Sequence, residues 1–290
     1  MRKYVLLGLF SIVGILGIFG YQYISFNDGL VHVIFCNVGQ GDGVLIKDSD
    51  GGYFLLDSGP DETILGCMER NMPFWKRDIS IAFLSHPHAD HFVGYLSVLS
   101  RYDVKVFVTE KLKNDTSAYK ALMGRIEKKG IQLLSSKMGD VFLLKNGMRF
   151  EVVGPSEAFL GVTSPGGKIG ETREFANLVI HLKYRKFSVL FSGDSQTDGM
   201  SEALGRIQGG GVDVLHIPHH GSKTGLSAGI LRSLSPSVGV ISVGRNKYGH
   251  PSREVLELLN VIGVRAFRTD QHGDVEIVSD GDKFWVKSRY

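Results

Sequence analysis

The chain has few cysteines, and its net charge is small. Two cysteines among 290 residues cannot form the disulfide framework that holds small secreted domains together. No cysteine lies near the histidine cluster described below, which argues against a structural metal site of four thiolates. The formal net charge of +3 gives no strong electrostatic argument for or against nucleic-acid binding. Ligands and reactions must therefore be inferred from local motifs.

The chain also lacks a low-complexity linker between residues 30 and 290, which favours a single domain over this range. The 37 glycines fall mostly between short apolar runs, as expected for many strands joined by tight turns. Cys36 lies inside such a run, so packing is its expected role, and a single bridge to Cys67 is equally open.

One long hydrophobic run is present near the N-terminus. Residues 4–24 are apolar almost throughout, which is long enough for a helix that spans a bilayer. Arg2 and Lys3 precede this run and no basic residue follows it closely, so we expect the N-terminus in the cytoplasm and the body outside it. A cleaved signal peptide and a buried core helix are the alternatives, but the run is long for the first and apolar on every face. We predict a single-pass membrane protein, with a tail and anchor over 1–27 and an extracytoplasmic domain over 28–290.

Short apolar runs bounded by Gly- and Asp-rich turns predict strands over 31–35, 43–47, 53–56, 79–84, 104–108, 131–134, 140–144, 148–153, 178–183, 187–192, 212–217 and 238–243. Helices are expected over 62–70, 92–99, 118–129, 200–208, 228–234 and 252–261. The first three strands are typical of an antiparallel meander, and the later alternation is typical of an α/β fold with helices outside the sheets. Residues 161–170 are a candidate flap.

Metal-binding side chains cluster directly after the predicted strand 79–84. His86, His88, Asp90 and His91 lie within six residues, on a loop that a buried strand would hold rigidly. Imidazole nitrogen and carboxylate oxygen suit Zn²⁺ first, with Mn²⁺ or Fe²⁺ as the next choices. The alternative is a solvated histidine-rich loop, but an ordinary loop has no reason to collect these donors.

Further donors follow later strands. If strands 79–84, 187–192 and 212–217 lie side by side, their carboxyl ends bring further ligands to the first cluster. We then expect two ions that share one carboxylate, with His86 and His88 on the first ion, Asp90, His91 and His220 (or His219) on the second, and Asp194 between them. Taken alone, Asp194 fits a turn after a strand equally well.

Two more residues are candidates from their positions. Asp57 ends a strand and could orient a ligating imidazole, or it could be a turn residue. His250 is a candidate acid or substrate-binding group, or part of a turn that enters a helix. The remaining histidines are interpreted as structural: His32, His181, His216 and His272.

The donor set indicates hydrolysis. Two divalent ions activate a water at neutral pH and stabilise charge on a phosphoryl or acyl oxygen. No serine or cysteine lies in a G-x-S-x-G nucleophile context, so a covalent route is not indicated. A purely structural metal site would be closed by four ligands and would not need six donors from three regions of the chain.

These motifs resemble a known family. The H-x-H-x-D-H run at 86–91, with Asp57, Asp194 and His219-His220, is similar to the metallo-β-lactamase superfamily, which implies a four-layer αβ/βα sandwich over about 30–290. More narrowly, the segments 37–42, 56–59, 86–91, 218–222 and 248–251 resemble the hydrolase domain of ComEC-type DNA-uptake proteins.

The narrower resemblance concerns further residues. It implies site roles for Gln40 and Asp42, which could otherwise simply shape a turn between two strands. Where the broad superfamily has a third histidine motif, this chain has Asn177, as ComEC-like members do. The first ion would then have fewer protein ligands and more positions open to water and substrate.

ComEC-type proteins carry this domain after a multi-helix channel and an oligonucleotide-binding fold, so the chain resembles their stand-alone, membrane-tethered relatives. The leading hypothesis is a membrane-anchored, two-metal phosphodiesterase or nuclease that acts on DNA, with Asp90, His219 and His250 as catalytic groups. One alternative is a phosphodiesterase for a cell-envelope substrate such as phosphocholine or teichoic acid. Another is a ligand-binding module with a degenerate metal site. No obligate protein partner is inferred.

Overall fold

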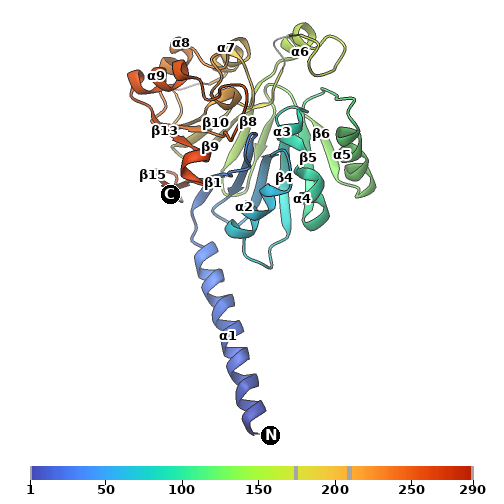
Figure 1. Ribbon diagram of the computed structural model, residues 1–290, viewed down its shortest axis with the longest axis vertical. Coiled ribbons are helices and arrows are strands. Elements are labelled where there is room, and N and C mark those ends of the chain that lie inside the picture. The colour runs from blue at the N-terminus through green and yellow to red at the C-terminus, as the bar shows by residue number, and fades with distance from the viewer. Residues whose placement is uncertain (1, 173–175, 208–210, 289–290) are drawn as a thin grey trace.

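Two β-sheets face each other with helices on their outer sides, and one long helix stands apart from them (Figure 1). This computed structural model describes residues 2–172, 176–207 and 211–288. The arrangement is the four-layer metallo-β-lactamase sandwich that the motifs imply, which confirms that prediction.

The first sheet is mixed. Its strands lie in the order β15 (Phe284–Ser288), β14 (Val275–Ser279), β1 (Val31–Phe35), β2 (Gly43–Lys47), β3 (Tyr53–Ser58), β4 (Asp78–Leu84), β5 (Asp103–Thr109) and β6 (Gln132–Ser135). Pairing is antiparallel from β15 to β3 and parallel from β3 to β6. The predicted meander over the first three strands is therefore confirmed.

The second sheet is mixed as well. Its strands lie in the order β13 (Arg265–Arg268), β12 (Val238–Ile241), β11 (Val214–His216), β10 (Phe187–Phe191), β9 (Val179–Tyr184), β8 (Arg149–Gly154) and β7 (Val141–Leu143). Pairing is parallel from β13 to β10 and antiparallel from β10 to β7.

The helices form the outer layers. The first sheet is flanked by α2 (Thr63–Asn71), α3 (Ala89–Phe92), α4 (Tyr95–Arg101) and α5 (Ser117–Lys128). The second is flanked by α7 (Thr197–Leu204), α8 (Ala228–Leu234) and α9 (Arg253–Ile262). The short helices α6 (Glu157–Thr163), η1 (Pro218–Gly221) and α10 (Thr269–His272) lie in the connections between strands. Apolar side chains of both sheets, such as Phe83, Phe150 and Phe191, form the core between them. Because this apolar core is buried and continuous, it fixes the two sheets relative to each other.

Helix α1 (Arg2–Phe26) leaves the sandwich and ends at the N-terminus, as the blue ribbon in Figure 1 shows. The 21 residues Leu6–Phe26 have a mean hydropathy of 1.7, and none of the residues in the apolar window of this stretch is fully buried in the protein. A helix of this length and composition can span a membrane, as the sequence predicts.

A disulfide joins Cys36, just after β1, to Cys67 in α2, with the two Cα atoms 5.8 Å apart. Both cysteines are completely buried. The bridge that the sequence leaves open is thus present in the structure.

The strand arrangement corrects one expectation. Strands 79–84, 187–192 and 212–217 were expected side by side, but β4 belongs to the first sheet, and β10 and β11 belong to the second. The carboxyl ends of all three still meet at one edge of the sandwich, because the two sheets face each other.

The helix expected over 92–99 is another correction, because it is broken between α3 and α4. A Cβ at Gly94 would overlap the carbonyl oxygen of Ser58, so this glycine allows β3 and α4 to approach closely. Further differences concern bounds. The expected flap 161–170 begins inside α6, helix α7 starts earlier than predicted, and the predicted end of that helix at residue 208 lies outside the described residues.

Candidate active site

The loop after β4 carries four of the predicted donors and is held in place by Asp57. The carboxylate of Asp57, at the end of β3, accepts hydrogen bonds from the Ser85 backbone N–H (2.8 Å) and hydroxyl (2.7 Å). It also accepts one from Nδ1 of His91 (2.8 Å). The other ring nitrogen of His91, Nε2, consequently points away from Asp57 and toward the later donors.

The second sheet contributes Asp194, one turn beyond β10. Its backbone N–H donates to the side-chain oxygen of Asn177 (3.1 Å). Asn177 thus stabilises the Gly193-Asp194 turn. Figure 1 shows β10 in the sheet that faces β4, so the two sheets supply different ligands.

His219 and His220 follow β11 in an unusual backbone conformation. Both residues are left-handed, with φ of 51° and 53°. Such non-glycine residues cost about 1–3 kcal/mol each and concentrate at functional sites. The turn directs His220 into the protein, where its Nδ1 donates to the carbonyl of Ser242 (3.0 Å), while His219 is partly exposed.

Two groups of donors share Asp194. One ligand atom from each member lies within 4.8 Å of the others in the groups His86, His88, Asp194 and Asp90, His91, Asp194, His220. In the second group, Nε2 of His220 lies 3.4 Å from both Asp90 and Asp194, and Nε2 of His91 lies 3.4 Å from Asp194. This is the grouping that the sequence predicts, with His220 rather than His219 beside the second set.

The buried polar atoms of this cluster fit a metal. Nε2 of His91, Nε2 of His220 and Oδ1 of Asp194 are buried and have no hydrogen-bond partner among the described residues. Buried polar atoms are normally paired, so three that face one another fit the donor set of a bound cation. Nitrogen and carboxylate donors of this kind suit a divalent cation such as Zn²⁺ or Mn²⁺.

Electrostatics in the cluster follow from burial and close charges. Burial raises the pKa of Asp194, but the nearby imidazoles of His220 and His91 outweigh it and hold the pKa well below its ordinary value. Burial lowers the pKa of His91, but the carboxylates of Asp194, Asp57 and Asp90 raise it well above the ordinary value. The pKa of His220 is likewise raised above its ordinary value, whereas burial lowers the pKa of His86 and His88. Without a metal, His91 and His220 therefore hold protons that a cation must displace.

A cleft of about 360 Å³ opens over the cluster, and Gln40, His88, Asp90, Asp194, His219, His220, Tyr248 and His250 line it. The rings of His219 and His250 lie 5.5 Å apart. Asn246 holds the loop of His250 by accepting the backbone N–H groups of Tyr248 (3.0 Å) and His250 (3.1 Å). This cleft gives a substrate access to both donor groups.

Asp42 lies behind the cluster, where it is buried. Its Oδ1 is 3.3 Å from Nδ1 of His220 and 3.6 Å from Nε2 of His216. His216, interpreted as structural from the sequence, thus borders the site, and only its position at the end of a strand could have indicated this. Gln40 accepts the N–H of Gly244 (3.3 Å) and so ties two loops of the cleft together.

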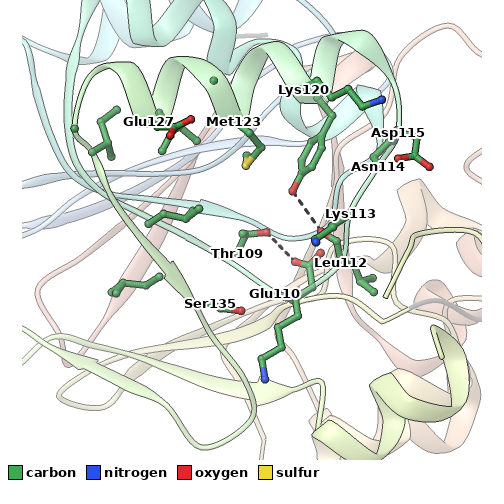
Figure 2. Close-up of a pocket in the computed structure, with 18 residues that line it drawn as sticks. Thr109, Glu110, Leu112, Lys113, Asn114, Asp115, Lys120, Met123, Glu127 and Ser135 are labelled. Carbon is green, nitrogen blue, oxygen red and sulfur yellow. Dashed lines mark hydrogen bonds between the residues drawn. The ribbon is translucent and has the colours of Figure 1, made fainter. Parts of the chain in front are cut away.

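A larger cavity lies elsewhere, beside α5, as Figure 2 shows. It measures about 1130 Å³, and its described lining residues include no histidine. Burial raises the pKa of Glu110 there well above its ordinary value, and Thr109 donates to this carboxyl (3.0 Å). The donor chemistry of the chain is therefore in the smaller cleft.

Comparison with known proteins supports the family resemblance that the motifs imply. The family model of the metallo-β-lactamase superfamily matches residues 36–245. ComE operon protein 3 of Bacillus subtilis is 26% identical over 277 residues, which cover 89% of this chain and 34% of that protein. Recombination protein 2 of Haemophilus influenzae is 26% identical over 83% of this chain and 28% of that protein. Competence protein ComA of Neisseria gonorrhoeae is 35% identical over 92 residues. The chain spans about a third of the length of the first two relatives.

Solved structures share the fold. The metallo-β-lactamase fold protein YhfI of Bacillus subtilis superposes with a TM-score of 0.53 over 89% of this chain and all of that chain, at 10% identity. A diphosphatase of the PhnP family superposes with a TM-score of 0.52 over 86% of this chain and 98% of that chain, at 15% identity. The resemblance to ComEC-type proteins is confirmed, and the chain belongs to the metallo-β-lactamase superfamily, whose members are generally metal-dependent hydrolases.

Proposed function

We propose that this chain is a membrane-anchored, extracytoplasmic phosphodiesterase that uses two divalent ions to hydrolyse DNA. The observation that carries the proposal is the convergence of two donor groups on Asp194 beneath an open cleft. Two divalent ions bound there would lower the pKa of a water and offset the charge that develops on a phosphoryl oxygen.

The chain itself prepares the ligand atoms. Asp57 holds the proton of His91 on Nδ1, and the Ser242 carbonyl does the same for His220, so in both imidazoles Nε2 is left for a cation. His86 and His88 would hold the first ion with Asp194. Asp90, His91 and His220 would hold the second ion with the same carboxylate.

Three cleft residues are proposed to act on the substrate. Asp90 is 35% exposed and lines the cleft, so its carboxylate is placed to accept a proton from the attacking water. Burial and the nearby imidazoles of His219 and His220 lower the pKa of His250, so its neutral ring can donate one hydrogen bond to a phosphoryl oxygen. His219, beside it, is proposed to bind the phosphate or assist the leaving group.

DNA is proposed as the substrate because of the relatives. One of them is named a competence protein and another a recombination protein, and the sequence motifs resemble DNA-uptake proteins. The near-neutral charge of the chain neither supports nor opposes this choice.

An extracytoplasmic position is proposed from two features. Basic residues precede the apolar helix at Arg2 and Lys3. The Cys36–Cys67 disulfide also suits an oxidising compartment, because cytosolic thiols are generally kept reduced.

The first test is elemental analysis of the purified chain, combined with hydrolysis of bis(p-nitrophenyl) phosphate after chelation and return of Zn²⁺ or Mn²⁺. We expect two ions per chain and turnover that depends on them. The Asp90→Asn and His88→Ala variants should lose this turnover, whereas Asp198→Asn, an exposed carboxylate four residues beyond Asp194, should keep it.

The outcomes separate the alternatives. Cleavage of duplex or single-stranded DNA would identify the polymer, whereas cleavage of small or cell-envelope phosphodiesters alone would replace DNA as the substrate. A chain that holds no metal and shows no turnover with any divalent ion would refute the hydrolase and favour a ligand-binding module.

A further inference from the structure

An aromatic loop of the hydrolase domain contacts the apolar helix well before that helix ends. The ring of Trp75 stacks on Phe19 of α1, with centroids 4.7 Å apart and planes 9° apart. The ring of Phe74 also packs edge-on against Phe19, with centroids 4.8 Å apart, and the backbone N–H of Phe74 donates to the side-chain oxygen of Gln22 (3.1 Å). The loop that precedes β4 is therefore packed along the helix rather than beyond its end.

The position of Phe19 sets the depth of this contact. Phe26, where α1 ends, lies seven helical steps after Phe19, which corresponds to about 10 Å along the helix axis. The apolar stretch Leu6–Phe26 is about as long as the hydrocarbon core of a bilayer is thick, about 30 Å. When α1 spans a membrane, Phe74 and Trp75 therefore lie in the outer part of the bilayer or in the adjoining headgroup layer.

The exposure of this loop is consistent with a lipid environment. Phe74 is 48% exposed and Trp75 37% exposed, although both are large and apolar. Tyr21 and Tyr23 are exposed on the same part of α1. Tryptophan and tyrosine favour the membrane interface because an apolar ring with a polar atom suits that boundary. Charged groups lie close by, where Lys76 follows Trp75 and Asp28 pairs with Lys47 at 2.6 Å.

We propose that the loop of Phe74 and Trp75 is a second membrane contact, which inserts into the lipid interface beside α1 and seats the domain on the bilayer. The inference rests on the proposal that α1 spans the membrane. The partner of this loop is lipid because the loop packs against a helix that would itself be surrounded by lipid.

This second membrane contact also sets the orientation of the active site relative to the bilayer. The loop lies at the amino end of β4, and the donor loop follows the carboxyl end of the same strand. Strand β4 runs from Asp78 to Leu84, so six steps of about 3.3 Å place the two ends about 20 Å apart. In Figure 1, α1 leaves at the lower side of the domain, and α3, next to the donor loop, lies toward the upper side. The cleft therefore faces away from the bilayer, and its substrates are phosphodiesters that stand clear of the membrane surface rather than lipid headgroups.

Tryptophan fluorescence tests the contact, because the chain has two tryptophans. A Trp285→Phe variant of the full chain leaves Trp75 alone, and it is reconstituted in vesicles of phosphatidylcholine and phosphatidylglycerol. We expect blue-shifted emission, most of which is lost when the lipids are brominated near the top of their acyl chains. The matched control combines Trp75→Phe, Trp285→Phe and Tyr248→Trp, which places the single tryptophan at the cleft, and its emission should be insensitive to bromine.

Co-flotation of the chain with the vesicles is measured in parallel. A chain that floats while Trp75 emission is insensitive to bromine overturns this inference and leaves the anchor intact. Blue-shifted emission that bromine does not quench also overturns it, because protein, such as a second copy, would then cover the loop. A chain that fails to float overturns the anchor and the inference together, whereas hydrolysis of bis(p-nitrophenyl) phosphate remains a separate test of the enzyme.

Discussion

Loss of the Cys36–Cys67 disulfide should destabilise the protein by several kcal/mol. The bridge closes a chain segment with a sequence separation of 31. In the chain-entropy description, a loop of this size restricts the unfolded state by about 3.7 kcal/mol at 25 °C, and measured losses for native bridges are about 2–5 kcal/mol. The bridge joins β1 to α2 on the outer face of the first sheet, behind the strands that carry Asp57 and the donor loop.

The assay is urea unfolding of the full chain in mild detergent, with and without a reductant, followed by circular dichroism. We expect the wild type to lose about 2–4 kcal/mol of unfolding free energy on reduction. The Cys36→Ala/Cys67→Ala double variant should be less stable under both conditions and should not respond to the reductant. This control separates the loss of the bridge from the loss of two buried sulfur atoms.

A wild type whose unfolding free energy is the same in oxidised and reduced form would refute the reasoning. The result also bears on location. A protein that needs this bridge for several kcal/mol of stability would be poorly suited to the reducing cytosol, and the proposed extracytoplasmic position would gain support.

Three further predictions concern stability and the site. Burial of His181 lowers its pKa to about 4, so the unfolded state takes up a proton first as pH falls below 6.5. Between pH 8 and pH 5, the unfolding free energy of the metal-free wild type should therefore fall by about 2 kcal/mol more than that of His181→Leu. Equal losses in the two proteins would contradict this. Gly94→Ala should destabilise the chain by about 1–3 kcal/mol in urea unfolding, whereas Gly124→Ala, in a helix with open space, should stabilise it slightly. Asp57→Asn should weaken metal affinity about 10–100-fold by releasing His91 while unfolding remains cooperative, and unchanged affinity in chelator competition would remove its orienting role.

The metal cluster could be predicted because its chemistry is local in the sequence. His86, His88, Asp90 and His91 follow a strand whose apolar residues alone identify it, and the ends of two later strands supply Asp194 and His220. Strand ends can be recognised from composition. The grouping around Asp194 assumed that the three strands lie side by side, and the donors still converge because the carboxyl ends of these strands meet across the two sheets.

The division of the strands between sheets could not be predicted in this way. An apolar run indicates a buried strand but does not indicate which neighbour it pairs with, so β4 was placed beside β10 and β11. The break at Gly94 depends on a carbonyl from β3, which lies 36 residues earlier. The strand β13 was not predicted, since Arg265–Arg268 is polar and only partly buried. The strands β14 and β15 and the helix α10 were not predicted either.

The same division explains why the site depends on the whole sandwich. His86, His88, Asp90 and His91 come from the first sheet, while Asp194 and His220 come from the second, so both donor groups that contain Asp194 need both sheets. The apolar core between the sheets brings the two sets together. Burial of several imidazoles and carboxylates at this place costs electrostatic free energy, which the free energy of burying the apolar core must offset. Cations bound by both sets would connect the sheets and bind only the folded state, so metal binding and folding must be thermodynamically linked. Asp194 is the centre of this linkage, because it is the one residue shared by the two donor groups that the site needs.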